Sequence, residues 1–514
     1  MNNPVRPSGS KDKVAVIGAG ISGLAAAVSL AAKGVEVVVL ESDESPGGKV
    51  RQSVTACGPV DKGPTVLTLP WVFDELLAQA NTSLEQNLDI QKLEVLAHHR
   101  WSDGSTLNLY DDREASASSI ENFAGATAAR EFEKFLELTS DLYEVLLPSF
   151  MQSARPGMRA TFSSAGLMGM LTMARARPFS SLWDRLGSLF SDLRLRQLYS
   201  RYATYCGSSP FLAPATLMLI AHVEQLGVWS VRGGMVELAR ALEQAARSCG
   251  AEFRYGSKMT DLKLTNGNVT GVLLENGELL NADQVIVTAD LNAVSGGLMG
   301  RDLASLISKP SKTEPSLSAV TWSGSAKIRG QGLDYHNVIF SDDYPAEFRA
   351  LTEKNEVPSQ PTVYLCAPDR GGVAEPRGDD QDERVFILIN APPASDNSDQ
   401  NVINIESNHA AAVQDRLEAC GISLDWGSAE FEYTTPGDFG ARFPGSRGSL
   451  YGSATHGWKS AFTRQGVVCD IPGVYFAGGG VHPGPGVPMV ALSGRAAAGQ
   501  AWEFIENRAR QKSR

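Results

Sequence analysis

The sequence predicts an α/β fold in which a parallel sheet at the N-terminus is joined to a mixed α+β region. The apolar stretches Val14–Ile17 and Val35–Leu40 flank Ile21–Lys33, which is rich in alanine and leucine at helical spacing and ends at Gly34. A strand, a helix and a second strand within about 30 residues indicate a parallel βαβ unit. Near the C-terminus, Val474–Ala477 and Val487–Glu506 repeat the order of strand, glycine turn and helix.

The middle of the chain predicts a second, mixed region. Residues Ala115–Leu226 are mostly helical by spacing, with breaks at Pro148, Pro156, Pro178 and Pro210. A helix over Gly233–Gly250 precedes strands at Glu252–Tyr255, Lys258–Leu264, Gly271–Leu274 and Gln284–Ala289. The stretch Ser316–Arg442 mixes strands and helices around two polar segments that we expect to be exposed loops, Pro368–Glu383 and Pro392–Gln400.

Composition excludes several classes of protein. A net charge of −12 argues against sequence-independent binding of nucleic acid. None of the six cysteines forms a CxxC pair, which predicts neither a metal site nor a disulfide framework but reduced thiols in the cytosol. The polar segment Met1–Lys13 lacks the apolar core of a signal peptide, and no uncharged run reaches the roughly 18 residues that span a bilayer.

A glycine motif follows the first predicted strand and reads Gly18-Ala19-Gly20-Ile21-Ser22-Gly23. In a dinucleotide site the first glycine permits a tight turn, the second lets the backbone approach a pyrophosphate, and the third lets the helix pack on the strand. The helix N-terminus then directs N–H groups at the phosphates. Glu41 closes the second strand, where a carboxylate accepts hydrogen bonds from an adenosine ribose. We therefore predict a Rossmann-type dinucleotide site, with a purely structural glycine turn as the alternative.

Two further segments favour FAD over NAD as the dinucleotide. Ser45–Arg51, which contains Gly48 and Lys49, resembles the second fingerprint of the amine-oxidase-like flavoproteins. Alone, it is equally consistent with a surface turn. In such flavoproteins a loop like Gly63-Pro64-Thr65-Val66 runs along the isoalloxazine ring.

The C-terminal motif extends from Phe476 to Pro488 and contains Gly479, Gly480 and Gly486 before the helix that starts at Val487 and Pro488. Glycines here allow a close backbone approach to a flavin, and the start of a helix stabilises negative charge on the reduced ring. His482 is either a base or a residue that fixes the loop, and we favour the second interpretation.

With these motifs the chain resembles the bacterial carotenoid desaturases of the phytoene-desaturase type over nearly its whole length. The resemblance implies a Rossmann-type FAD-binding domain made from residues 1–90, 227–295 and 443–514, to which Met259 adds a cofactor contact. Residues 91–226 and 296–442 are then a mixed α+β substrate domain, with a helical, membrane-facing part at about 115–226. General amine oxidases usually carry an acid where this chain has Gly478–Gly480, which argues against that activity.

Several phrases are similar to one branch of this family, the 1-hydroxycarotenoid 3,4-desaturases, or hydroxyneurosporene desaturases. They are Arg201–Tyr205, Pro315–Ala319, Tyr364–Ala367 and Arg442–Ser446. The resemblance implies FAD-dependent desaturation of an acyclic 1-hydroxycarotenoid, as in the spheroidene and spirilloxanthin routes of purple phototrophic bacteria. Phytoene desaturation is the alternative enzyme activity. A non-catalytic prenyl-lipid chaperone is the alternative of another class, because Rab escort proteins reuse this fold.

Desaturation transfers a hydride to the flavin and needs an apolar tunnel and a proton acceptor. The apolar residues of Ala115–Leu226 form either this tunnel or an ordinary helical core. Glu224 is a weak candidate for the proton acceptor, and a structural ion pair is the favoured alternative. The electron acceptor, a quinone or oxygen, is not readable from the sequence.

We also expect a cytoplasmic protein that lies on the inner or photosynthetic membrane, since carotenoids are insoluble in water. The segment Ala165–Phe179 is the predicted contact, with Arg175 and Arg177 at anionic headgroups. A buried helix of the substrate domain is the alternative.

Overall fold

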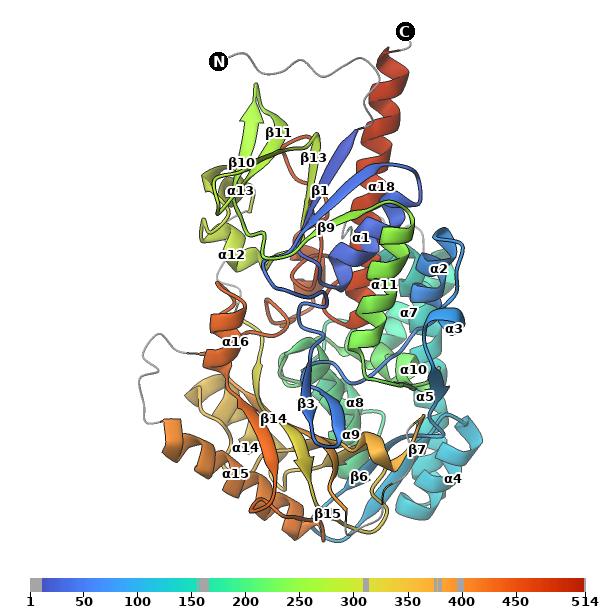
Figure 1. Cartoon of the computed structure of the whole chain (residues 1–514). Helices are drawn as coiled ribbons and strands as arrows, with labels where there is room; N and C mark the ends of the chain where they lie inside the picture. The colour runs from blue at the N-terminus through green and yellow to red at the C-terminus, as the bar shows by residue number, and fades with distance from the viewer. Residues whose placement is uncertain are drawn as a thin grey trace.

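The computed structural model describes residues 12–154, 157, 166–307, 314–373, 377, 381–394 and 402–512. Most of the predicted N-terminal segment Met1–Lys13, and also Pro156, Ala165 and most of the predicted loop Pro392–Gln400, lie outside these residues. The chain forms two layered halves, and the end of the long C-terminal helix lies at the end of the first half that is remote from the second (Figure 1).

The first half is built on a five-stranded sheet in which every neighbouring pair is parallel, in the order β21-β13-β1-β2-β9. Its strands are β1 (Lys13–Ile17), β2 (Glu36–Leu40), β9 (Glu252–Arg254), β13 (Gln284–Val287) and β21 (Val474–Phe476). Apart from the edge strand β9, they are almost continuous apolar runs, because both faces of a parallel sheet are covered. The predicted parallel sheet and its βαβ unit are therefore confirmed.

Helix α1 (Ile21–Ala31) is buried along its whole length between the sheet, α11 (Val236–Ser248) and the long helix α18 (Val487–Lys512). Its small side chains allow this close packing. At the crossing with α18, a Cβ on Gly494 would lie 2.1 Å from the carbonyl oxygen of Ser22, so only glycine fits there. Helices α2 (Trp71–Gln79) and α3 (Leu84–Asn87) follow on the same side.

A three-stranded antiparallel sheet extends the first half, with β10 (Met259–Thr265), β11 (Asn268–Leu274) and β12 (Leu279–Asn281). The sequence-based prediction started β11 too late, at Gly271. Asn266 and Gly267 have φ values of 51° and 76°, which form a tight hairpin turn of the Asn-Gly type and bring Asn268 into the ladder.

The second half is built on a seven-stranded mixed sheet in the order β20-β14-β18-β17-β16-β6-β7, in which only the β16–β6 pair is parallel among the described strands. Its strands are β6 (Val95–Arg100), β7 (Thr106–Tyr110), β14 (Ser318–Ala326), β16 (His336–Ile339), β17 (Val363–Cys366), β18 (Glu383–Ala391) and β20 (Glu430–Thr434). Outside the sheet lie α14 (Tyr344–Arg349), α15 (Val402–Ala419) and the short pair β15 (Ile328–Arg329) and β19 (Ser423–Leu424).

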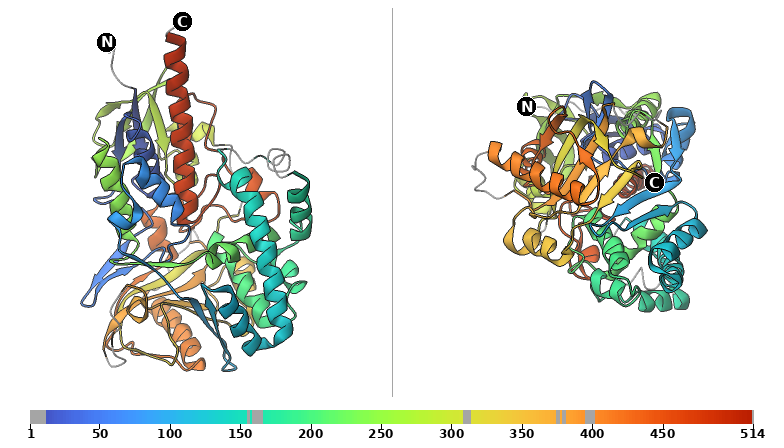
Figure 2. Two further views of the ribbon diagram at one scale, coloured as in Figure 1. Left: turned by 90° about the vertical axis from the view of Figure 1, so that its right-hand side faces the viewer. Right: turned by 90° about the horizontal axis from the view of Figure 1, so that it is seen from below.

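Helices gather on one side of this half (Figure 2). They are α4 (Arg113–Ala124), α5 (Ala126–Leu146), α7 (Gly166–Ala176), α8 (Leu182–Gly187), α9 (Leu193–Ser200) and α10 (Leu219–Gln225), so the predicted helical character of this stretch is confirmed. Pro148 does not end α5 sharply, because the chain continues through a single π-helical turn at Leu147–Met151. Among the described helices, none combines the length and the apolar character that crossing a bilayer requires.

Short elements connect the two halves. The hairpin of β3 (Gln52–Thr55) and β4 (Gly58–Asp61) contacts β14 and β18, and β5 (Ile90–Lys92) pairs with β8 (Trp229–Val231). Helices α12 (Leu291–Ser295), α13 (Arg301–Leu306), α16 (Pro436–Arg442) and α17 (Ser460–Thr463) complete the described elements with segments of 3-10 and π helix. We propose that the FAD-binding domain contains the five-stranded sheet and the substrate domain the seven-stranded sheet, with the boundaries that the sequence predicts.

Candidate functional site

A cavity of about 910 Å³ extends from the glycine turn after β1 into the helical side of the second half. This volume lies at the upper end of the range for small-molecule sites, about 300–1,000 Å³. Almost all residues predicted for the cofactor, together with Glu224, line it. They are Gly18, Gly20, Ser22, Glu41, Gly48, Lys49, Gly63, Pro64, Thr65, Val66, Met259, Gly479, Gly480, Gly486, Val487 and Pro488.

The three glycines of the first motif have different surroundings. Gly18 has a φ of 104°, which favours glycine, and a Cβ on Gly23 would lie 1.9 Å from the carbonyl oxygen of Gly18. Gly20 differs, since its φ is −70° and an added Cβ would meet no heavy atom nearer than the Cα of Gly48 at 4.0 Å. The protein's own packing therefore does not require glycine at position 20. An open space beside the N-terminus of α1 fits a pyrophosphate.

Glu41 is held at the end of β2, beside the same turn. Its carboxylate accepts hydrogen bonds from the backbone N–H groups of Ala19 at 2.6 Å and Asp43 at 2.9 Å. Ala19 does not line the cavity, but it fixes the carboxylate that does. The role of Glu41 at a ribose stays a prediction that this geometry supports.

The loop Gly63–Val66 is packed from two sides. A Cβ on Gly63 would lie 2.1 Å from the carbonyl oxygen of Lys49. The loop therefore packs directly against the segment that follows Gly47 and Gly48. On the other side, the Thr65 hydroxyl lies 2.6 Å from the Tyr364 hydroxyl on β17. This loop therefore lies between the glycine segments and the seven-stranded sheet.

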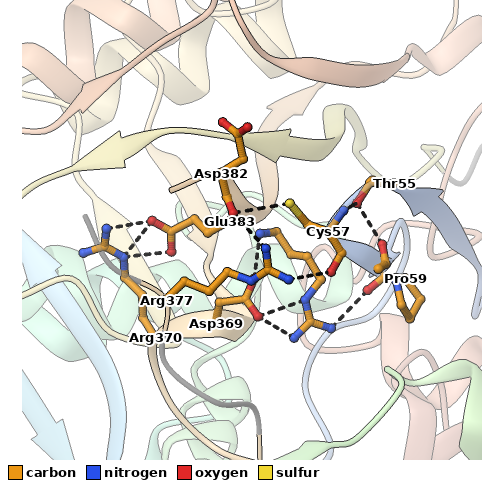
Figure 3. Close-up of polar contacts among 10 residues, drawn as sticks. Thr55, Cys57, Pro59, Asp369, Arg370, Arg377, Asp382 and Glu383 are labelled. Atoms are coloured by element: carbon orange, nitrogen blue, oxygen red, sulfur yellow. Dashed lines mark hydrogen bonds and ion pairs between the residues drawn. The ribbon is translucent and has the colours of Figure 1, made fainter. Parts of the chain in front are cut away.

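Buried ion pairs hold the β3–β4 hairpin that leads into this loop (Figure 3). Arg377 donates to the carbonyl oxygen of Cys57 at 3.1 Å, and Arg384 donates to that of Pro59 at 3.2 Å. Arg384 also pairs with Asp369 at 2.7 Å, and the Asp369 side chain is only 4% exposed. Removing one partner of the Arg384–Asp369 pair would leave a buried charge uncompensated and would destabilise the protein.

The C-terminal glycine loop is fixed by two side chains. Arg464 donates to the carbonyl oxygen of Gly479 at 2.9 Å. His482 is fully buried, and its Nε2 lies 2.7 Å from the carbonyl oxygen of Phe150. Burial lowers the pKa of His482 to about 4, so the ring is neutral at pH 7. His482 does not line the cavity, and these contacts support its interpretation as a residue that fixes the loop.

A polar cluster lines the cavity beside Thr65, and among its members only Glu224 was assigned a role from the sequence. The cluster consists of Arg201, Tyr205, Tyr364 and Glu224. The Arg201 guanidinium donates to the Tyr205 hydroxyl at 2.8 Å and lies over the Tyr364 ring at 5.4 Å. Three of these residues belong to the branch-specific phrases Arg201–Tyr205 and Tyr364–Ala367. These two stretches were the signal that the sequence offered, but it did not show that Arg201 and Tyr364 contact each other.

Glu224 accepts a hydrogen bond from the Tyr202 hydroxyl. The favoured ion-pair interpretation is wrong for the part of the chain described, where no lysine or arginine lies within ion-pair distance of this carboxylate. Burial raises the pKa of Glu224, while Tyr202 and the charge of Arg201 oppose the shift. The carboxyl group lines the cavity, so its candidacy as a proton acceptor remains.

Beyond this cluster the lining of the cavity is mostly apolar and reaches α7 and the residues that follow it. Met173, Pro178, Phe179, Trp458 and Phe462 line this part, and the Phe179 and Trp458 rings meet edge to face at 5.0 Å. The outer face of α7 is apolar and exposed, with Leu167 76%, Met168 75%, Met170 54% and Leu171 52% accessible. The alternative of a buried helix is therefore wrong.

Comparison with known proteins agrees with this geometry. A model of the flavin-containing amine oxidoreductases matches residues 21–501. The chain belongs to this family. It is 40% identical to a hydroxyneurosporene desaturase of Rubrivivax gelatinosus, over 97% of this chain and 95% of that protein. A 1-hydroxycarotenoid 3,4-desaturase of a Flavobacterium is 32% identical, over 95% and 98%, and a phytoene desaturase of Neurospora crassa 29%, over 95% and 84%.

A solved structure of putrescine oxidase shares the fold, with a TM-score of 0.61, 14% identity and coverage of 97% of this chain and 99% of that one. Together with the family match, this likeness confirms the predicted fold class, apart from its membrane-facing part, and the family match confirms the predicted cofactor, FAD. The open space at Gly20, the acceptor Glu41 and the glycine loop at Gly479 fit this cofactor. When bound, FAD supplies the hydride acceptor.

Proposed function

We propose that the chain is an FAD-dependent desaturase that introduces the 3,4 double bond of acyclic 1-hydroxycarotenoids. The observation that carries the proposal is the continuity of the cavity. One space joins the flavin-binding turn to a long apolar channel, as a linear polyene requires. The identity of 40% with a hydroxyneurosporene desaturase, against 29% with a phytoene desaturase, supports the hydroxylated substrate.

The residues of the chain orient the substrate and exclude water. The apolar lining holds the polyene, and the seven-stranded sheet closes the cavity with side chains such as Phe386 and Leu388. A proton must leave the carbon next to the one that loses the hydride. Glu224 is the candidate acceptor within the polar cluster, although conjugation in the product favours proton loss even to a weak base.

Incubation with 1-hydroxyneurosporene and with phytoene, separately, tests the proposal. We expect the absorption of 1-hydroxyneurosporene to move to longer wavelength as the conjugated system grows, and phytoene to be unchanged. Conversion of phytoene alone contradicts the proposal in favour of the alternative enzyme. A protein that is purified without flavin absorption and then binds carotenoids without changing them supports the chaperone alternative. The electron acceptor, a quinone or oxygen, is then identified by adding each to the reaction.

We also propose that the exposed face of α7 lies in the surface of the inner or photosynthetic membrane. The channel opens beside this face, so a carotenoid can pass from lipid into the cavity without crossing water. Arg177 is exposed and lies near Arg175 and Arg185, which places positive charge at headgroup level. Arg175 also pairs with Asp141 at 3.0 Å, so only part of its charge faces lipid.

Serine at Leu167, Met170 and Leu171 tests this contact. Their exposed fractions of 76%, 54% and 52%, at about 2 kcal/mol for each fully buried side chain, give about 3–4 kcal/mol of insertion energy. The partition coefficient onto anionic liposomes should therefore fall a few hundred-fold, with FAD retained. A control variant carries serine at Val54 and Leu279, which are exposed on β3 and β12. If the triple variant still floats with the liposomes, α7 is not the contact.

A further inference from the structure

The polar cluster lies in a cavity whose lining is mostly apolar. Within the described residues, the only hydrogen bond of the Arg201 side chain goes to Tyr205, and no carboxylate lies within ion-pair distance of its guanidinium. A guanidinium has five N–H donors in a planar fork. Most of these donors therefore have no partner among the described residues, although the side chain lines the cavity that the substrate enters.

An arginine in this position is costly unless a ligand satisfies it. A hydrocarbon that filled the channel would remove water from the guanidinium and return no hydrogen bond. A hydroxyl group would accept from Arg201, and the Glu224 carboxylate, which lines the same cavity, is an acceptor for its own proton. The cluster thus suits an alcohol at the end of an apolar chain.

The cluster also lies at the right place along the channel. Tyr364 holds Thr65, which belongs to the loop predicted to run along the flavin ring, at 2.6 Å between the hydroxyl oxygens. In a 1-hydroxycarotenoid, two carbon–carbon bonds of about 1.5 Å each separate C1 from C3. The hydroxyl must therefore be held close to the ring when C3 and C4 react. A polar cluster elsewhere in the channel would place other carbons at the flavin.

We propose that Arg201 is the residue that recognises the substrate hydroxyl and so selects hydroxylated carotenoids and sets which bond is desaturated. Tyr205 acts as a positioning residue that holds the guanidinium toward the cavity. This inference rests on the proposed function, since it names the part of the substrate that the site reads. A site built to hydrogen-bond a hydroxyl rejects the analogue without it by up to about 10⁴–10⁵-fold.

The test compares 1-hydroxyneurosporene with neurosporene, which has the same polyene and lacks the hydroxyl. Binding is measured from the absorption band of each carotenoid with holoenzyme whose flavin has been reduced, so that no turnover occurs. Steady-state kcat/KM is measured separately with oxidised enzyme. We expect wild-type protein to prefer the hydroxylated compound. Arg201→Met should bind it about 10–100-fold more weakly, the loss of one charge-assisted hydrogen bond, and bind neurosporene no less tightly.

Matched variants separate recognition from general damage. Arg201→Lys should recover part of the preference, because lysine keeps the charge without the planar fork. Tyr205→Phe should weaken binding of the hydroxylated compound by less than Arg201→Met. Tyr199→Phe, which removes a hydroxyl that is buried outside the cavity and has no hydrogen-bond partner in the described structure, should change nothing in binding.

Three outcomes overturn the inference. The first is an Arg201→Met protein that keeps the full preference for the hydroxyl. The second is an equal loss for both carotenoids. The third is a loss of FAD or a shift of its absorption spectrum with the preference intact, which would make Arg201 a flavin contact. Wild-type protein that converts neither carotenoid refutes the proposed function instead, so the two failures are distinguishable.

Discussion

Gly20 allows a sharp test of cofactor binding, because the protein without its cofactor has room for a side chain there. At a φ of −70° the backbone accepts any residue, and the nearest atom to an added Cβ is 4.0 Å away. Gly20 is the N-cap of α1, where an apolar residue in place of glycine costs about 1 kcal/mol. We expect Gly20→Leu to lower the free energy of unfolding by about this amount and to leave the fold intact.

The effect on FAD should be much larger. A leucine at this position occupies the space that a pyrophosphate would fill, and it keeps the phosphates from the backbone N–H groups at the start of α1. Losing two such charge-assisted hydrogen bonds costs about 3–6 kcal/mol. The dissociation constant for FAD should therefore rise at least 100-fold.

The assay is the ratio of flavin to protein absorbance after gel filtration, beside thermal unfolding followed by circular dichroism. Gly23→Ala is the informative control, because its Cβ would lie 1.9 Å from the Gly18 carbonyl oxygen and must disturb the turn itself. It should lose FAD together with much of its stability, whereas Gly20→Leu loses FAD at a cost of only about 1 kcal/mol in the free energy of unfolding. Full flavin occupancy in a folded Gly20→Leu protein would falsify the assignment of the pyrophosphate to this turn.

Three further predictions concern the same site and its support. Glu41→Ala should retain less FAD than wild type at equal circular dichroism, because ribose hydroxyls lose a charged acceptor; unchanged retention contradicts this role. Gly479→Val should lower flavin content and turnover, because the new side chain occupies space beside the flavin. The protein itself tolerates the change, since the added Cβ has ordinary 3.8 Å contact with Pro485 and the backbone is unstrained, whereas Gly486 has a φ of 118°. Wild-type spectra and rates would place the flavin elsewhere. Burial raises the pKa of Asp61 to about 7 from 3.8, so the folded protein keeps a proton that the unfolded chain releases between about pH 4 and 7. The contribution of Asp61 to the unfolding free energy is fully present below pH 4 and falls by up to about 1.4 kcal/mol per pH unit up to pH 7. Chemical denaturation at a series of pH values should show that Asp61→Asn lacks this pH-dependent contribution. Identical pH profiles for the two proteins would refute it.

The N-terminal part of the site was predictable because its signals are local. The turn Gly18–Gly23, the helix after it and Glu41 at the end of β2 are encoded within one βαβ unit, and each glycine there has a physical reason. The sequence placed the end of β10 at Leu264, one residue before its end at Thr265, but the Asn266–Gly267 turn that leads into β11 was not recognised.

The polar cluster was not predictable, since Arg201 and Tyr364 meet only when a helical segment is placed over β17. The exposure of α7 was expected from the predicted membrane contact, but the apolar spacing alone could not establish it. Leu167, Met170 and Leu171 give the same apolar spacing whether a helix faces a core or a lipid surface. Only the neighbours decide between them, and those neighbours come from distant parts of the chain.

The parallel sheet has a consequence for how the protein is made. Its central strand, β1, leaves the ribosome first, yet its neighbour β13 and the outer strand β21 come from the middle and the end of the chain. During most of synthesis β1 thus has an unpaired apolar edge, which makes nascent chains prone to aggregate and dependent on chaperones. The loop at Gly478–Gly480 follows β21, so FAD can be enclosed only after nearly the whole polypeptide has been released.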